Sequence, residues 1–445
     1  MRFAPWMRAS LLGLGLILAA EGRAAVIGVN VPAASLTVAR VEMLPLEQRR
    51  PWLAYLARSQ QQREADRASL VAERAALPPG SPVPAAPEGG HADKSMPLNH
   101  APAWYASAAA RRVADNILSF QTPAGGWGKN QPRDRPPRQP GQDYVADNNS
   151  PRAVAGDFDL AENPRWSYVG TIDNDATITE IRFLAKVAAQ LTESDAVVYR
   201  ASALKGLAYL LAAQFPNGGW PQVWPLQGGY HDAVTLNDNA VVEVAELLGE
   251  VGQGATEWGF VPVELRKQAL AAEQRAIALL LVSQVSIDGR KRIWAQQYDA
   301  LSLAPVAARN FEPASLCTGE SVDVLLYLMR QTEPSAEMKR AVEAGIASLR
   351  ELALADVQWT RLDEARGRHL IAKPGAGPLW ARYYEAGSLK PVFGDRDKTL
   401  HDNVNEISLE RRNGYAWFGI WPLKALAAYE SWSRRWLKPE GAARH

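Results

Sequence analysis

The sequence predicts an all-α fold, an (α/α) toroid of helical hairpins joined by long loops rich in Gly, Pro and Trp, with a helical extension at its N-terminus. Three observations support this prediction. From residue 103 onward apolar residues recur at helical spacing, whereas the period-two alternation of strands is almost absent. A unit of helix, Gln, short Gly turn and Trp also repeats, beginning at Gln121, Gln214 and Gln284. Repeated helical hairpins that curl into a ring form a toroid.

The first 25 residues have the composition of a secretory signal peptide. Arg2 and Arg8 supply a basic start, residues 11–20 are apolar, and small residues follow. We therefore expect cleavage and export, to the periplasm or beyond. The apolar part is too short to span a bilayer, and no other stretch approaches the required length of about 20 residues. Cys317 is the single cysteine of the chain, so no internal disulfide can form.

The rest of the chain divides into three parts. Residues 26–77 predict a helical extension, because residues 46–77 are rich in Ala, Arg, Glu, Gln and Leu. Residues 78–102 form a Pro/Gly-rich linker. Residues 103–437 form the predicted toroid, and one large helical domain fits that length. Within it we expect helices over residues 106–120, 178–190, 194–214, 239–251, 263–285, 321–329, 335–354 and 415–434.

The composition limits the classes of partner. The formal net charge is +1, so no overall basic field attracts nucleic acid. The 15 Trp residues favour a carbohydrate ligand, because flat aromatic faces stack on sugar rings. We expect a monomer that binds a polysaccharide and no nucleic acid.

Two loops deliver acidic side chains to the start of a predicted helix. TIDNDAT contains Asp173 and Asp175, and LNDN contains Asp238. Such residues can serve as N-caps, each contributing about 1 kcal/mol. The loops hold more acceptors than capping needs, and carboxylate and amide oxygens also suit Ca²⁺. The inner helices of a toroid run in the same direction, so both loops should lie on one rim. The positive helix ends disfavour a cation, and we expect weak binding that substrate carboxylates strengthen.

A second set of charged residues is basic and lies in later loops. Single surface arginines are commonly solvated, but together these side chains suggest a groove for carboxylates, which Arg binds with two parallel hydrogen bonds. The set comprises Arg309, Arg382, Lys390, Arg396, Arg411 and Arg412. Tryptophans beside the same loops are either sugar platforms or packing residues at the toroid corners: Trp127, Trp220, Trp224, Trp294, Trp380 and Trp417.

Eight segments resemble one known enzyme family. TIDNDATITEIRFLAKV, FPNGGWPQVWP, TLNDNAV, IWAQQYD, ARNFEPASL, LWARYYEAG, FGDRDK and ERRNGYAWFG occur in that order within residues 106–437. They are similar to segments of the family 10 polysaccharide lyases, pectate lyases with an (α/α) toroid. The resemblance implies cleavage of polygalacturonate by β-elimination with Ca²⁺ as cofactor. The extension before residue 104 lies outside it.

The resemblance also assigns roles. It implies that Asp173 and Asp238 hold Ca²⁺ together with a substrate carboxylate, that Arg309 is the base at C5, and that Arg382 and Arg396 bind substrate. Lys390 is a weaker match to a substrate-binding position. Asp175 departs from members that have a small residue there.

Three more residues of these segments are expected to contact the sugar: Trp220, Tyr383 and Arg412. The role of Arg309 poses a chemical difficulty, since a guanidinium is normally protonated at all pH values of interest. We expect neighbouring Ca²⁺ and arginines to lower its pKa.

Three other functions are compatible with parts of the pattern. The motif from Gln121 to Trp127 resembles the QW signature of triterpene cyclases, which are also toroids, although the basic loops then have no role. An inverting glycoside hydrolase could use two carboxylates on the same scaffold. A non-catalytic polyuronate-binding protein is the third alternative. Catalytic zinc is not expected, because no second His or Cys stands at ligand spacing to His231.

Overall fold

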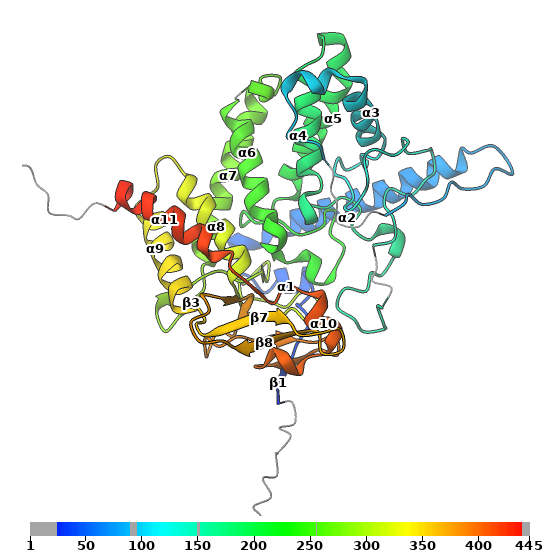
Figure 1. Cartoon of the computed structure of the whole chain (residues 1–445). Helices are drawn as coiled ribbons and strands as arrows, with labels where there is room; N and C mark the ends of the chain where they lie inside the picture. The colour runs from blue at the N-terminus through cyan, green and yellow to red at the C-terminus, as the bar shows by residue number, and fades with distance from the viewer. Residues whose placement is uncertain (1–24, 90–95, 149–151, 255, 438–445) are drawn as a thin grey trace, which may run out of the picture.

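A computed structural model describes residues 25–89, 96–148, 152–254 and 256–437 (Figure 1). The predicted signal peptide lies outside these residues except for Ala25. The helices are α1 (Val38–Val41), α2 (Leu46–Ala75), α3 (Ala108–Ser119), α4 (Ile178–Ala188), α5 (Glu193–Ala213), α6 (Ala240–Gln253), α7 (Val263–Ser283), α8 (Thr318–Arg330), α9 (Ala336–Glu351), α10 (Leu409–Gly414) and α11 (Pro422–Trp436). The short helices α1 and α10 were not predicted; the other helices begin and end within a few residues of their predicted bounds, with one exception described below.

Helices of the main domain form hairpins that stack in two layers. The hairpins are α4–α5, α6–α7 and α8–α9. One layer follows α4, α6, α8 and α11, each in contact with the next, and the other follows α5, α7 and α9. Figure 1 shows the hairpins side by side in chain order. This two-layer array is how a toroid is built, and the closed ring stays a prediction of the sequence.

The repeated Gln and Trp residues brace the corners between hairpins. Gln214 at the end of α5 donates from Nε2 to the carbonyls of Gly218 in its own loop and Ala272 in α7, both at 2.9 Å. Trp220 donates from its indole to the carbonyl of Leu210 in α5 at 2.7 Å. The repeated Gln residues therefore tie each helix in the layer of α5, α7 and α9 to the next helix of that layer. The matching bonds elsewhere join Gln121 to Gly125 and Ser202, Trp127 to Ile117, Gln284 to Arg292 and Ala341, and Trp294 to Leu280.

Short strands link successive corner loops and correct the expectation of an almost strand-free chain. The pairs are β2 (Val234–Thr235) with β5 (Gln297–Tyr298), β6 (Leu316–Cys317) with β10 (Tyr383–Tyr384), and β9 (Trp380–Ala381) with β13 (Phe418–Gly419). Strands of two residues leave no periodicity in a sequence. Further strands are β3 (Ser286–Ile287), β4 (Arg290–Lys291), and the hairpin β7 (Val357–Arg361) and β8 (Arg368–Ala372).

The predicted helix over residues 415–434 begins too early. Tyr415 and the residues up to Trp421 are not helical, and β13 lies among them. Helix α11 begins at Pro422, whose fixed φ and missing N–H suit the first helical position. The apolar and aromatic residues of this segment mimic helical spacing, but they line a loop between α10 and α11.

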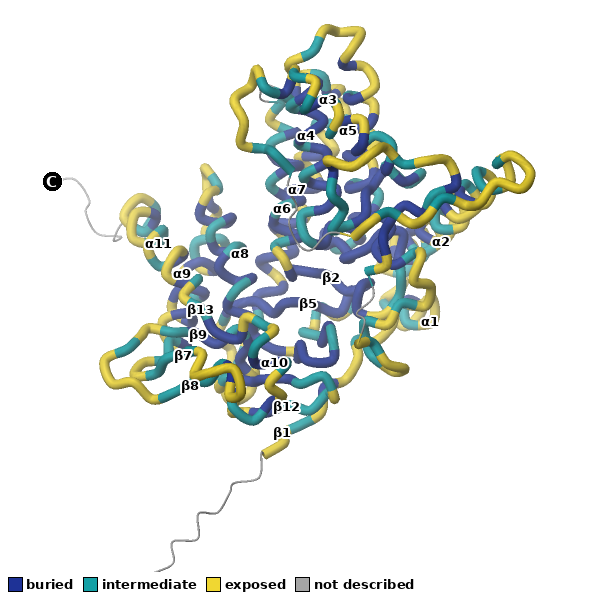
Figure 2. The backbone as a smooth tube through the Cα atoms, turned by 45° about the vertical axis from the view of Figure 1, so that its right-hand side comes forward, coloured by how far each residue is buried: buried dark blue, intermediate teal, exposed yellow. Residues whose placement is uncertain are grey.

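The N-terminal extension is not wholly helical. Its first strand, β1 (Val26–Val29), pairs antiparallel with β12 (Thr399–His401), which in turn pairs with β11 (Phe393–Gly394). Helix α2 packs Trp52 and Tyr55 against Phe215 of the main domain. These residues belong to one large hydrophobic core, visible as the buried interior in Figure 2. The extension therefore shares the core of the main domain.

Helix α5 alone among the described helices is long and apolar enough to cross a membrane by composition. Half of its apolar window is buried inside the molecule, and the helix packs against α4 and α7. Core helices commonly have this composition, so α5 gives little support to a membrane span.

Candidate active site

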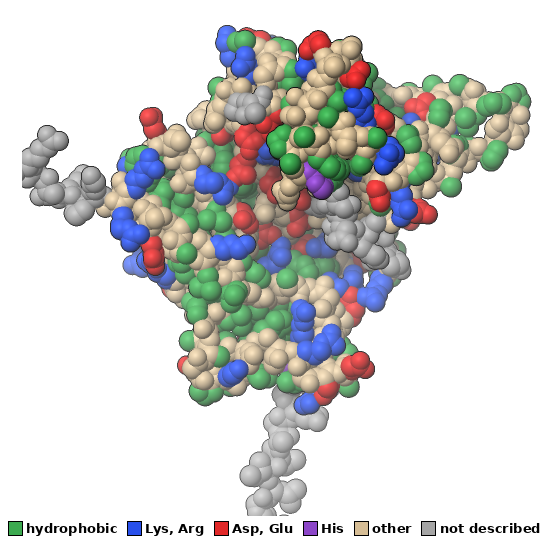
Figure 3. Space-filling view, turned by 45° about the horizontal axis from the view of Figure 1, so that its top comes forward, with side chains coloured by type: hydrophobic (Ala, Val, Ile, Leu, Met, Phe, Trp, Pro, Cys, Tyr) green, Lys and Arg blue, Asp and Glu red, His purple; other side chains and the backbone are tan. Residues whose placement is uncertain are grey.

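The two acidic corners meet in one cavity together with the loop that carries Arg309. The turns η3 (Asp173–Asp175) and η5 (Asn237–Asn239) contact each other. A cavity of about 230 Å³ is lined by Asp173, Asp238 and Arg309 among others. Figure 3 shows acidic side chains above a group of basic ones near the middle of the face in view. The predicted convergence of these three residues is therefore present in the structure.

Both acidic turns have an unusual backbone. Asn174 has φ 55°, Asp175 54°, Asp238 50° and Asn239 62°, all in the left-handed region. Asn and Asp visit this region more readily than other residues with a side chain. Several such residues in succession mark a constrained segment, and segments of this kind cluster at functional sites.

The aspartates do not cap the helices that follow them. The N-cap of α4 is Thr177, which forms a capping box with Glu180. The N-cap of α6 is Asn239, and its side chain makes no capping bond. The capping alternative for Asp173 and Asp238 is therefore wrong, and both carboxylates face other partners.

Asp173 is buried and held by two donors. Lys129 lies 2.5 Å from Oδ2 through its Nζ, and Gln222 donates from Nε2 to Oδ1 at 2.8 Å. Burial alone would raise the pKa of Asp173, but the positive charge of Lys129 and these bonds hold it below the ordinary value. The Lys129 ammonium also lies 3.4 Å from the ring centre of Tyr168. The sequence analysis missed Lys129, although it directly follows the GGWG corner.

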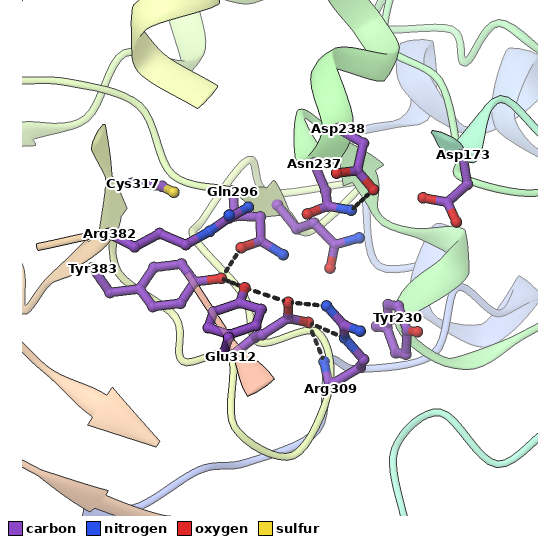
Figure 4. A network of polar contacts seen from close by, with 12 residues as sticks. Asp173, Tyr230, Asn237, Asp238, Gln296, Arg309, Glu312, Cys317, Arg382 and Tyr383 are labelled. Carbon is purple, nitrogen blue, oxygen red and sulfur yellow. Dashed lines mark hydrogen bonds and ion pairs between the residues drawn. The ribbon is translucent and has the colours of Figure 1, made fainter. Parts of the chain in front are cut away.

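Asp238 lines the same cavity, and part of the residue is exposed to solvent while the surrounding protein removes water from its carboxylate. It accepts a hydrogen bond from Asn237 Nδ2 at 2.9 Å (Figure 4). The surrounding protein, followed by the negative charges of Asp173 and Glu320, raises the pKa of Asp238 to about 7. Of this pair of carboxylates, Asp173 is therefore ionised first and Asp238 changes its charge near neutral pH.

Arg309 is joined to Glu312 by two parallel hydrogen bonds. Its Nε and Nη2 lie 2.8 and 2.6 Å from Oε2 and Oε1 of that carboxylate. Tyr415 also donates to Oε1 of Glu312, at 2.7 Å. Although burial alone would lower the pKa of Arg309, the charge of Glu312 raises it well above the ordinary value. The charge of Glu312 therefore opposes the lowering of this pKa that the sequence predicts from neighbouring Ca²⁺ and arginines, and that lowering stays a prediction.

A second arginine and two tyrosines continue this network. Arg382 pairs with Glu320, and its guanidinium lies 5.2 Å from the ring centre of Tyr415. Tyr383 is fully buried and bonds to Gln296 and, at 2.6 Å, to the hydroxyl of Tyr415 (Figure 4). Tyr383 therefore bonds to a residue that lines the cavity but does not line it itself. The prediction that it contacts the sugar is wrong.

Like Arg382, four other predicted sugar contacts are not among the residues that line the cavity. Trp220 is fully buried as a corner brace, so its ring cannot stack on a sugar, and that prediction is corrected. Arg396 pairs with Glu410 at 2.9 Å. Arg412 lies against His369, and Lys390 is exposed on the turn after β10. The roles of Arg396, Arg412 and Lys390 in binding stay predictions.

The oxygen atoms around Asp173 and Asp238 suit a hard cation. Besides the two carboxylates, the buried Oε1 atoms of Gln222 and Gln297 have no hydrogen-bond donor among the described residues. Ca²⁺ prefers carboxylate and amide oxygens and needs six to eight of them. The described residues contain no group of three or more His, Cys, Asp or Glu that could hold a metal. The residues present therefore fit a partial calcium shell that water and a ligand would complete.

Acidic and basic side chains converge on one cavity, an arrangement that suits a ligand with carboxylates, and the comparisons give the class of protein. The model of the pectic acid lyase family matches residues 121–426, more than half of the chain. The chain therefore belongs to the pectic acid lyase family and is a lyase.

Solved structures from Cellvibrio cellulosa are similar to this chain. One is a family 10 polysaccharide lyase, 28% identical with a TM-score of 0.61, covering 77% of this chain and 96% of that one. The other is an Asp-to-Ala mutant of family 10 polysaccharide lyase in complex with trigalacturonic acid, 27% identical with a TM-score of 0.61, covering 77% and 99%. A search of curated protein sequences gave no significant match.

Proposed function

We propose that this lyase is a pectate lyase that cleaves α-1,4-linked polygalacturonate by calcium-assisted β-elimination, with Arg309 as the base at C5. The observation that carries the proposal is the convergence of Asp173, Asp238 and Arg309 on one cavity. Membership of the pectic acid lyase family and the trigalacturonic acid complex of the similar structure support the choice of substrate.

Asp173 and Asp238 are the residues that would hold calcium, with amide oxygens beside them. When bound, calcium neutralises the uronate carboxylate and so makes the C5 proton more acidic. Arg382 is the proposed second partner of that carboxylate; it does not line the cavity and pairs with Glu320 in the structure, so its guanidinium would have to leave Glu320 to reach the substrate. Lys129 partly balances the negative charge of Asp173 before a cation arrives.

The elimination requires a proton acceptor beside C5. The C5–H bond breaks, its electron pair forms the C4=C5 double bond, and the C4–O bond breaks so that the leaving oxygen takes a proton from water. Arg309 must be neutral to accept the C5 proton. In this proposal Arg309 first loses one guanidinium proton to solvent, against the charge of Glu312, which holds it protonated in the structure. The neutral guanidine then takes the proton from C5 and is a guanidinium again, and the proton released to solvent balances the one that the leaving oxygen takes from water.

One assay separates this proposal from its alternatives. Polygalacturonate is incubated with the protein with and without a calcium chelator, and the ultraviolet absorbance of the unsaturated product is followed. We expect absorbance that the chelator removes and added calcium restores. New reducing ends without absorbance would indicate a hydrolase, and binding without product would indicate a non-catalytic protein. The QW-like motif needs no cyclase to explain it, because Gln121 and Trp127 brace a corner.

Two variants test the residue roles in the same assay. Arg309→Ala should abolish turnover and leave polygalacturonate binding within about tenfold of the wild type, because the base acts on the transition state. Asp173→Ala should weaken the rescue by added calcium. A near-normal rate for the first variant, or an unchanged calcium dependence for the second, would remove that residue from its role. Export by the predicted signal peptide and action as a monomer complete the proposal.

A further inference from the structure

Residues 25–44 run from the predicted signal peptide to α2, and we call them the N-terminal strap. The strap contains β1 and α1 and lies outside the segment matched by the family model. Through β1 it adds a strand to the β11–β12 pair, directly beside the loop that carries Arg396. Its residue Asn30 contacts the cavity-lining loop that carries Arg309. The strap is therefore a part of this chain that contacts the cavity-lining loop but is not matched by the family model.

Asn30 of the strap binds the turn that carries Arg309. Its Nδ2 donates to the carbonyl oxygens of Arg309, Asn310 and Glu312 at 3.3, 3.0 and 3.2 Å. Asn30 is 5% exposed, and its own N–H donates to the carbonyl of Lys398 at 2.7 Å. Three backbone carbonyls thus share one buried amide. Without it they would lose their common donor in a place that water reaches poorly.

A second bond from the strap fixes the start of the same loop. Arg40 pairs through Nη2 with Oδ2 of Asp299 at 2.8 Å, and Asp299 also accepts from the backbone N–H of Leu301 and Ser302. The Nη1 of Arg40 is bonded within the strap to the carbonyls of Ala34 and Ser35, both at 3.1 Å. The loop from Asp299 to Glu312 is therefore held by the strap at both ends.

We propose that the N-terminal strap completes the active site and that Asn30 is a positioning residue for Arg309. Asn30 acts through the backbone of the 309–312 turn, whose carbonyls it gathers while the side chains of Arg309 and Glu312 meet on the cavity side. The proposal rests on the proposed role of Arg309 as the base. A displacement of the turn by about 1 Å is enough to lower a catalytic rate about 100-fold.

The kinetic test compares three variants of the full-length protein. Asn30→Ala removes the donor, Asn30→Asp keeps the side-chain shape but places oxygens against the three carbonyls, and Val31→Ala changes an exposed neighbour. We expect kcat to fall about 10- to 100-fold in both Asn30 variants, with KM for polygalacturonate within about twofold. Val31→Ala should match the wild type. A kcat of Asn30→Asp close to that of the wild type would overturn the proposal, because a side chain of the same shape without the amide donor would then position the turn equally well.

Hydrogen exchange tests the same proposal without relying on activity. In Asn30→Ala the backbone amides of the 309–312 turn should exchange faster than in the wild type, while those of α6 and α7 stay protected. Unchanged exchange in the turn would overturn the positioning role. A wild-type protein that shows this protection but cleaves no polygalacturonate would refute the proposed function and leave the structural link between Asn30 and the turn intact. Faster exchange with unchanged kcat would overturn the catalytic consequence of the link.

Discussion

The proposed calcium site should bind its ion in a strongly pH-dependent manner near neutrality, because Asp238 has a pKa of about 7. Protons and calcium compete for this carboxylate. Asp173 does not add to the dependence in this range, since its pKa lies below the ordinary value of a carboxyl group. The sign follows directly: calcium affinity rises with pH until Asp238 is fully ionised, and bound calcium in turn releases a proton.

The pKa of Asp238 sets the size of the effect. At pH 6 only about one Asp238 in 11 is ionised, and at pH 8 about ten in 11, by the titration curve of a single group. The apparent dissociation constant for calcium should therefore be about tenfold larger at pH 6 than at pH 8. In Asp238→Asn the affinity should be weaker at both pH values and nearly independent of pH.

Isothermal titration calorimetry at pH 6, 7 and 8 measures the affinity for calcium. Repeating it in buffers of different ionisation enthalpy measures the number of protons released on binding. Asp175→Asn is the matched control, because Asp175 lies in the same turn as Asp173 but does not line the cavity. It should retain the tenfold change. Equal affinities of the wild type at pH 6 and pH 8, or a tenfold change that persists in Asp238→Asn, would refute the assignment of Asp238 as the titrating ligand.

Three further substitutions test other parts of the account. Glu312→Gln removes the anion that raises the pKa of Arg309, so the pH at which the rate is half-maximal should be lower than in the wild type; an unchanged pH–rate profile would show that Glu312 does not control the protonation of Arg309. Trp220→Phe loses the indole bond to Leu210 and should lower the free energy of unfolding by about 1 kcal/mol in urea titrations. Its KM for polygalacturonate should stay unchanged, and a raised KM would contradict the assignment of Trp220 as a corner brace. Lys390→Ala removes a predicted substrate contact on an exposed loop, so KM for polygalacturonate should rise while kcat stays near that of the wild type, and an unchanged KM would show that Lys390 takes no part in binding.

The sequence was informative wherever one short segment determines the structure. The apolar spacing after TIDNDAT and LNDN predicted α4 and α6, and the repeat of Gln, Gly and Trp predicted the corners. The loops of Asp173, Asp238 and Arg309 come together because hairpins stacked in chain order place them on one side. That convergence follows from the repeat, so it could be predicted without the structure.

The structure was needed wherever two distant segments determine the outcome. Whether Trp220 stacks on a sugar or braces a corner depends on a carbonyl in the preceding helix, and composition alone does not decide between them. The pairing of Arg309 with Glu312 was readable in ARNFEP, since the two stand three residues apart, but a loop has no fixed spacing rule. Asn30 gives no local signal at all, because its partners lie 279 to 282 residues away.

A crystal structure of Arg309→Ala with calcium and an oligogalacturonate tests the central claim most directly. We expect the metal between Asp173 and Asp238, with a uronate carboxylate in its shell, and C5 of the adjoining sugar within reach of the position that the Arg309 guanidinium occupies in the wild type. A sugar chain bound on another face of the molecule, or a metal held by other residues, would contradict the claim that these three side chains form the reaction centre.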